Sequence, residues 1–193
     1  MHSFVSRVQQ RSSTFSTYVI IASVVVAIVS LAQLYVSGAF GLQSEVGGIR
    51  PTLSMRTSRR FGSTGKPKEN VRIVFDLDAD LSPLFNWNTK QVFVYLTAEY
   101  GGAREDISNE VTFWDKIITS KADAKLALQN ERSKYSIWDV KESFEGRNAT
   151  VHLHWNLQPK VGFLVYGETV AHDSESSKPW FIMPREKNAD KEA

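Results

Sequence analysis

The sequence predicts an all-β domain, an antiparallel β-sandwich, that follows a single N-terminal transmembrane α-helix. Three features lead to this prediction: a 22-residue stretch without charges near the N-terminus, short segments in which apolar and polar residues alternate, and Gly, Pro and Asn residues between those segments. Alternation with a period of two is typical of a strand with one buried face. Several such strands, divided by turn residues, are typical of a β-sandwich.

The uncharged stretch, residues 15–36, contains no Asp, Glu, Lys, Arg or Pro. A helix of this length is about 33 Å long, enough to cross a hydrocarbon core of about 30 Å. Because a backbone in lipid must satisfy its own hydrogen bonds, we expect this stretch to be helical. A cleavable signal peptide, cut after the small residues 37–39, is the alternative. The apolar run is longer than the core of about 7–15 residues found in signal peptides, which favours a retained signal anchor.

Arg7 and Arg11 precede the helix, and no acidic residue does. The positive-inside rule then places the N-terminus in the cytosol and the bulk of the chain on the far side of the membrane. The expected divisions are a cytosolic N-terminus (1–14), the signal-anchor helix (15–36), a basic lumenal linker (37–70), the lumenal β-sandwich (71–183) and a charged, disordered tail (184–193).

The strand pattern is clearest over residues 71–81 and 148–157, where every second residue is apolar. The segment 90–100 carries apolar residues on both faces, so we expect a central strand that is covered on both sides. Further strands are expected at 111–118, 134–140, 161–170 and 180–183, with 122–128 either a short helix or an edge strand, and one short strand at 49–55 inside the linker.

The composition excludes several kinds of site. The chain has no cysteine, so disulfides, cysteine zinc sites and thiol nucleophiles are all excluded. Residues 45–70 carry six basic and two acidic residues, which gives this segment an excess of positive charge. This excess lies beside the membrane rather than on the predicted folded face, so we expect no binding to nucleic acid.

Asp76, Asp78 and Asp80 form the D-x-D-x-D that opens an EF-hand calcium loop. Leu81 and Trp87 stand where that loop requires Gly and Glu. The three carboxylates also alternate with apolar residues, which favours the solvated face of a strand.

Other catalytic or metal-binding patterns are weak. His152 and His154 share one strand face, without further His or Cys close in sequence, and we expect an exposed polar face there. No G-x-S-x-G elbow accompanies the four histidines, so nothing indicates a serine hydrolase. We therefore expect no enzyme activity, metal or cofactor in this chain.

Asn148, Ala149 and Thr150 form the only N-glycosylation sequon. This sequon falls at a turn entering a strand, on the side expected to be translocated. Asn148 is therefore the expected glycosylation site, and an ordinary threonine on a strand face is the alternative.

Four segments closely resemble one known family: LFNWNTKQVFVYLTAEY (84–100), EVTFWDKII (110–118), SKYSIWD (133–139) and HLHWNLQPKVG (152–162). They are similar to the non-catalytic subunit 3 of the endoplasmic reticulum signal peptidase complex, most of all to its fungal members. The resemblance extends from the helix to about residue 170.

The resemblance implies a type II single-pass protein of the endoplasmic reticulum membrane with a lumenal β-sandwich. It further implies that the catalytic serine lies in another subunit, and that this chain supports the removal of signal peptides from nascent secretory proteins. The implied partners are the catalytic subunit and the other small membrane subunits, with nascent chains contacted indirectly. A membrane-anchored lumenal binding module, lectin-like or cargo-binding, is the alternative function.

Docking onto a catalytic subunit requires exposed apolar side chains. The turn 84–87 and the strand 111–118 offer aromatic residues for this purpose: Phe85, Trp87, Phe113 and Trp114. Filling the core is the alternative role, in particular for Phe113 and Trp114.

Overall fold

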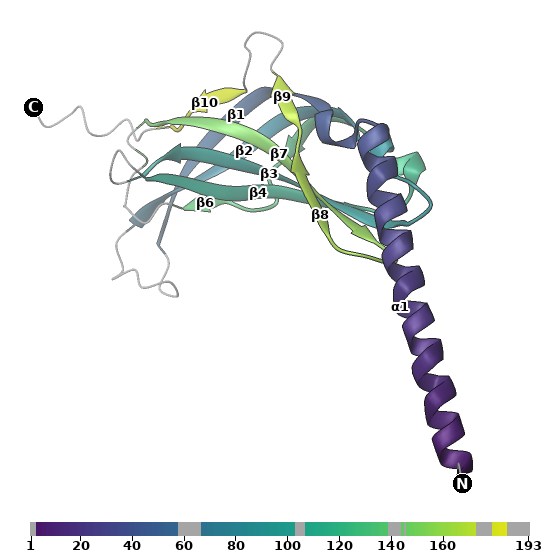
Figure 1. Ribbon diagram of the computed structural model, residues 1–193. Coiled ribbons are helices and arrows are strands. Elements are labelled where there is room, and N and C mark those ends of the chain that lie inside the picture. The colour runs from purple at the N-terminus through teal and green to yellow at the C-terminus, as the bar shows by residue number, and fades with distance from the viewer. Residues whose placement is uncertain are drawn as a thin grey trace, which may run out of the picture.

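The computed structural model describes residues 3–57, 67–102, 107–138, 144, 146–172 and 179–184. Figure 1 shows one long helix followed by two packed β-sheets. The helix, α1 (Phe4–Val36), extends away from the sheets at its N-terminal end, and its last turns lie beside one end of the sheets (Figure 1). The predicted β-sandwich behind one N-terminal helix is therefore confirmed.

Helix α1 begins earlier than the expected residue 15. Ser3 caps it, because the Ser3 hydroxyl accepts a hydrogen bond from the Ser6 N–H at 3.3 Å. Among the described residues α1 is the one helix whose length and composition suffice to span a membrane. Ser30 and Leu34 are its buried residues, so most of the helix surface is free of contact with the sheets.

The strands are β1 (Gln43–Thr57), β2 (Pro67–Asp80), β3 (Thr89–Gly101), β4 (Ser108–Ile118), β5 (Lys125–Arg132), β6 (Ile137–Trp138), β7 (Asn148–Pro159), β8 (Val165–Glu168), β9 (Val170–His172) and β10 (Trp180–Ile182). Sheet A has the order β5-β2-β1-β9, with β6 also beside β2, and sheet B has the order β10-β7-β3-β4, with β8 also beside β7. All described strand pairs are antiparallel except β1 and β9, which run parallel.

The core lies between the inward faces of the two sheets. The period of two in the sequence puts every second side chain of β2, β3 and β7 there, and each of these side chains is at most 3% exposed. They are Val71, Ile73, Phe75, Leu77 and Ala79 from β2, Val92, Val94, Leu96 and Ala98 from β3, and Val151, Leu153, Trp155 and Leu157 from β7.

Strand β1 lies where a linker was expected over residues 37–70. Up to Val46 its buried side chains fall at even positions, whereas the partly buried apolar side chains further along, Ile49 and Leu53, fall at odd positions. The change occurs because the pairing with β2 shifts at a bulge that contains Gly47 and Gly48, the latter with φ 59°. The bulge interrupts the period of two, so the sequence shows no sustained strand pattern.

The strand expected over 161–170 is divided between the two sheets. β8 pairs with β7 in sheet B, and β9 pairs with β1 in sheet A. Thr169 connects them: its N–H donates to the Leu153 carbonyl at 2.9 Å, and its hydroxyl lies 2.6 Å from the Ser44 hydroxyl. Residues 160–164 form the loop between β7 and β8.

The remaining strand predictions agree with the structure in most places. The strands expected at 71–81, 90–100, 111–118, 148–157 and 180–183 are β2, β3, β4, β7 and β10, and 122–128 falls mostly in the edge strand β5. β3 is central, but Phe93 and Tyr95 on its outer face are only half-buried. Of the strand expected at 134–140, residues 137–138 form β6, while 139–143 and 185–193 lie outside the described residues.

Candidate partner-binding surface

The turn between β2 and β3, residues 81–88, closes the end of the sandwich that adjoins α1. Side chains hold it in one shape. The Thr89 hydroxyl donates to the Leu84 carbonyl at 2.8 Å and accepts from the Asn86 N–H at 3.1 Å. The Asn86 side-chain oxygen accepts from the Asn88 N–H at 2.9 Å. Asparagine and threonine side chains stabilise tight turns in this way.

This turn also joins the sandwich to α1. The side-chain amide of Asn86 donates to the Ser30 hydroxyl at 3.1 Å, and the Ser37 hydroxyl donates to the Pro83 carbonyl at 3.3 Å. Leu34, between these two contacts, is 1% exposed. The polar contacts and the buried leucine together fix the orientation of the helix relative to the sandwich.

The four aromatic residues named as docking candidates lie in different environments. Phe113 and Trp114 are buried in the core, where both meet the ring of Phe75 edge-on, with ring centroids 5.5 and 5.8 Å apart. Phe85 is half-buried against the core, whereas Trp87 is 53% exposed. Of the four, Trp87 offers the most free apolar surface.

A further apolar surface, which is not among the four predicted aromatic residues, lies beside Trp87. The Lys160 ammonium donates to the Trp87 carbonyl at 3.4 Å, and in the same loop Phe163 and Leu164 are 83% and 49% exposed. The sequence signal for this loop was the Gly162 that follows the break at Pro159. The apolar run after Gly162 predicts a strand, but the structure has a loop up to the start of β8 at Val165.

His152 and His154 lie half-buried on the outer face of sheet B. The His152 ring nitrogen is 3.4 Å from the Glu99 carboxylate, and the His154 nitrogen is 3.1 Å from the Glu110 carboxylate. Tyr95 stacks on His154 with ring centroids 5.1 Å apart, and burial raises the pKa of the Tyr95 phenol above its usual value. Across the residues that the structure describes, no three His, Asp, Glu or Cys side chains gather as a metal site would require.

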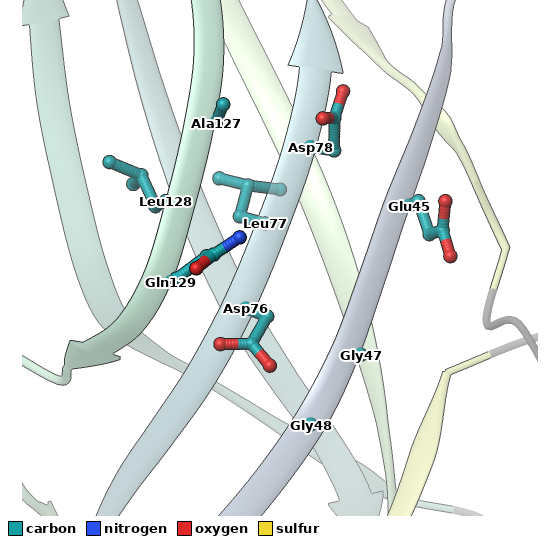
Figure 2. A pocket seen from close by; sticks show the side chains of 9 residues that line it. All are labelled: Glu45, Gly47, Gly48, Asp76, Leu77, Asp78, Ala127, Leu128 and Gln129. Atoms are coloured by element: carbon teal, nitrogen blue, oxygen red, sulfur yellow. The ribbon is translucent and has the colours of Figure 1, made fainter.

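Figure 2 shows an open groove on sheet A between β1, β2 and β5, with Glu45, Asp76 and Asp78 among its lining residues. Glu45 and Asp78 are directly opposite one another in the strand pairing, where like charges repel. Asp80 is not part of this groove, and its carboxylate accepts a hydrogen bond from the Ser82 N–H at 2.9 Å. The D-x-D-x-D run is therefore the polar side of a strand, as its alternation indicates.

Asn148 is exposed at the first position of β7, opposite Ile182 of β10. Pro159, at the other end of β7, lies eleven residues further, which is about 36 Å along the strand. Since the next residues after Pro159 contact α1, the sequon and the helix are at opposite ends of the sandwich.

Comparisons with known proteins agree with one another. A family model described as signal peptidase subunit matches residues 1–178, which include α1 and every described strand except β10. A Debaryomyces hansenii protein named signal peptidase complex subunit 3 is 53% identical over 171 residues, 88% of this chain and 90% of the relative. Proteins of the same name are 52% identical in Saccharomyces cerevisiae (89% of this chain, 94% of the relative) and in Yarrowia lipolytica (94% and 100%).

Proposed function

We infer the function of this chain from its family, because it belongs to the signal peptidase subunit family along nearly its whole length. It is a non-catalytic accessory subunit of the endoplasmic reticulum signal peptidase complex, the complex that removes signal peptides from secretory proteins. The observation that carries this inference is identity above 50% that covers both the helix and the sandwich.

We place the chain in the endoplasmic reticulum membrane as a type II protein, with the sandwich in the lumen. Arg7 and Arg11 on the short side of α1 support this orientation. The contacts of Ser30, Leu34 and Ser37 with the sandwich support a retained helix over a cleaved signal peptide, since cleavage after residue 39 would remove a buried leucine from the domain.

The physical role follows from the junction between helix and sandwich. Signal peptides are cut at the lumenal surface of the membrane, so a catalytic subunit must be held there. A rigid sandwich on a membrane helix restricts the positions and orientations of a bound partner, which raises the effective concentration of that partner at the membrane surface. We place the contact with the catalytic subunit on Trp87 and the adjoining Phe85, because Phe113 and Trp114 fill the core.

The test is affinity purification of the tagged full-length chain from native membranes in mild detergent, followed by quantitative mass spectrometry. We expect the catalytic subunit of signal peptidase in near-equal amount, together with other small membrane subunits. Recovery of this chain alone, or with glycoprotein cargo, would contradict the accessory role and favour a membrane-anchored binding module.

A further inference from the structure

The loop between β7 and β8, residues 160–164, lies beside α1 at the level of Ala27, well before the end of the helix. A Cβ atom built on Gly162 would be 3.1 Å from the Ala27 Cβ, and Leu31 and Phe163 line the narrow crevice between helix and loop. In Figure 1 the loop end of the β7–β8 hairpin lies beside the helix, part-way along its length. The loop therefore contacts the stretch of helix that is expected to lie in the membrane.

The depth of this contact follows from the helix geometry. Counted from Ser12, the first residue after Arg11, the roughly 20 residues that cross a hydrocarbon core end at Leu31. If the membrane-spanning segment is instead the uncharged stretch 15–36, it ends at Val36. Ala27 lies before both ends, by about 6 Å and about 14 Å along the helix axis. With either boundary, the loop beside Ala27 reaches the level of the acyl chains.

The side chains of this loop have the apolar character that contact with lipid acyl chains requires. Residues 161–167 contain no charge, and Val161, Phe163 and Leu164 are 38%, 83% and 49% exposed. Lys160 is exposed at the base of the loop, and Lys90 is exposed next to Thr89, whose strand partner is Pro159. An apolar tip with cations at its base matches the chemistry of acyl chains below lipid phosphates.

The backbone at the start of the loop is also supplied with hydrogen-bond partners. Asn88 is 2% exposed, and its side-chain amide donates to the Val161 carbonyl at 2.8 Å while its side-chain oxygen accepts from the Val161 N–H at 3.1 Å. The Asn88 carbonyl accepts from the Lys160 N–H at 2.6 Å. An irregular segment near lipid needs such partners, since water is scarce there.

We propose that the β7–β8 loop is a second membrane anchor, in which Val161, Phe163 and Leu164 insert among the lipid acyl chains beside α1, below the headgroups. The occupant of this surface is lipid. The proposal requires only that α1 spans a membrane, so it stands or falls separately from the role in the signal peptidase complex.

The chain has no native cysteine, so one engineered cysteine gives one labelled site. The full-length Phe163→Cys variant carries an environment-sensitive fluorophore and is placed in phosphatidylcholine nanodiscs. Quenching by a lipid with a spin label high on its acyl chain is compared with quenching by aqueous iodide. The control is Ile182→Cys, because Ile182 is an apolar side chain of β10 with 55% exposure at the end of the sandwich remote from the loop.

We expect a ratio of lipid to iodide quenching several-fold higher at position 163 than at position 182, with a blue-shifted emission at 163. Equal ratios would overturn the proposal. Shielding of position 163 that appears only after the catalytic subunit is added would also overturn it, because a protein partner would then cover the loop. Leu164→Cys is a second site for the same measurement if the Phe163 variant does not fold.

Discussion

At the scale of single residues, Asn88 connects the turn 81–88 with the loop 160–164. Its side chain makes two hydrogen bonds to the backbone of Val161, and it is buried itself. Replacing it by alanine leaves both backbone groups of Val161 without their protein partners. We expect Asn88→Ala to lower the free energy of unfolding by about 1–3 kcal/mol.

Denaturant unfolding of the full-length chain in detergent measures this change. Gln129→Ala is the control, since Gln129 is an exposed residue of β5 and its truncation is expected to change stability by less than about 0.5 kcal/mol. Equal unfolding midpoints for the two variants would show that Asn88 does not hold the loop.

Whether Asn148 carries a glycan tests the proposed orientation of the chain in the membrane. A glycan on its exposed side chain requires that the sandwich be in the lumen during synthesis. We expect part of the native protein to shift to higher electrophoretic mobility on treatment with an endoglycosidase, and Asn148→Gln to remove this shift. Thr150→Ser, which retains the sequon, is expected to keep it. If the endoglycosidase leaves the mobility of the native chain unchanged, Asn148 is not a glycosylation site.

The sequence could not separate the buried aromatic residues from the exposed ones. Phe113 and Trp114 are adjacent in β4, so alternation places them on opposite faces, yet both are buried. The pairing of β4 with β3 shifts between Leu96 and Thr97, beside the partner of Trp114, and this irregularity allows both rings to reach Phe75. A bulge of this kind depends on the neighbouring strand, which the local pattern does not contain.

At the scale of elements, the regular strands were predictable and the irregular ones were not. In β2 and β7 the buried apolar residues all fall at odd positions, and this regular alternation predicts both strands. β1 changes parity at Gly47 and Gly48, and the chain from β8 to β9 changes sheets at Thr169. Both changes depend on long-range pairing, so a window of consecutive residues does not show them.

The junction between α1 and the sandwich depends on Leu34, which packs at the base of the sandwich. We expect Leu34→Ala to lower the free energy of unfolding by about 2–5 kcal/mol, because it leaves a cavity beneath the turn 81–88. Val36→Ala is the matched control: Val36 lies two residues further in the same helix and is 85% exposed.

Thermal unfolding of both variants in the same detergent measures the difference. If Leu34→Ala and Val36→Ala unfold at the same temperature, the helix does not rely on this contact, and the sandwich would be free to reorient relative to the membrane.

At the scale of the whole molecule, one end of the sandwich carries α1, Trp87 and the loop 160–164, and the opposite end carries Asn148. The helix and the family were evident from the sequence, since charge-free length and extended motifs are local signals. The convergence of the helix with two loops was not, because the contact between Ser30 and Asn86 joins residues 56 positions apart. This convergence places the proposed protein contact and the proposed lipid contact side by side.

The location of the protein contact can be tested with two tryptophans of equal exposure. Trp87 is 53% exposed at the end near the helix, and Trp180 is 52% exposed on β10 at the opposite end. Burying a new charge in a protein interface is costly, so we expect Trp87→Glu to reduce recovery of the catalytic subunit at least tenfold. Trp180→Glu is expected to leave recovery of the catalytic subunit unchanged.

About half of the surface of each tryptophan is exposed to solvent, so we expect both variants to unfold near the temperature of the native chain. Equal recovery with Trp87→Glu and Trp180→Glu would place the docking surface elsewhere on the sandwich, whereas a loss of recovery accompanied by unfolding would make Trp87 a structural residue.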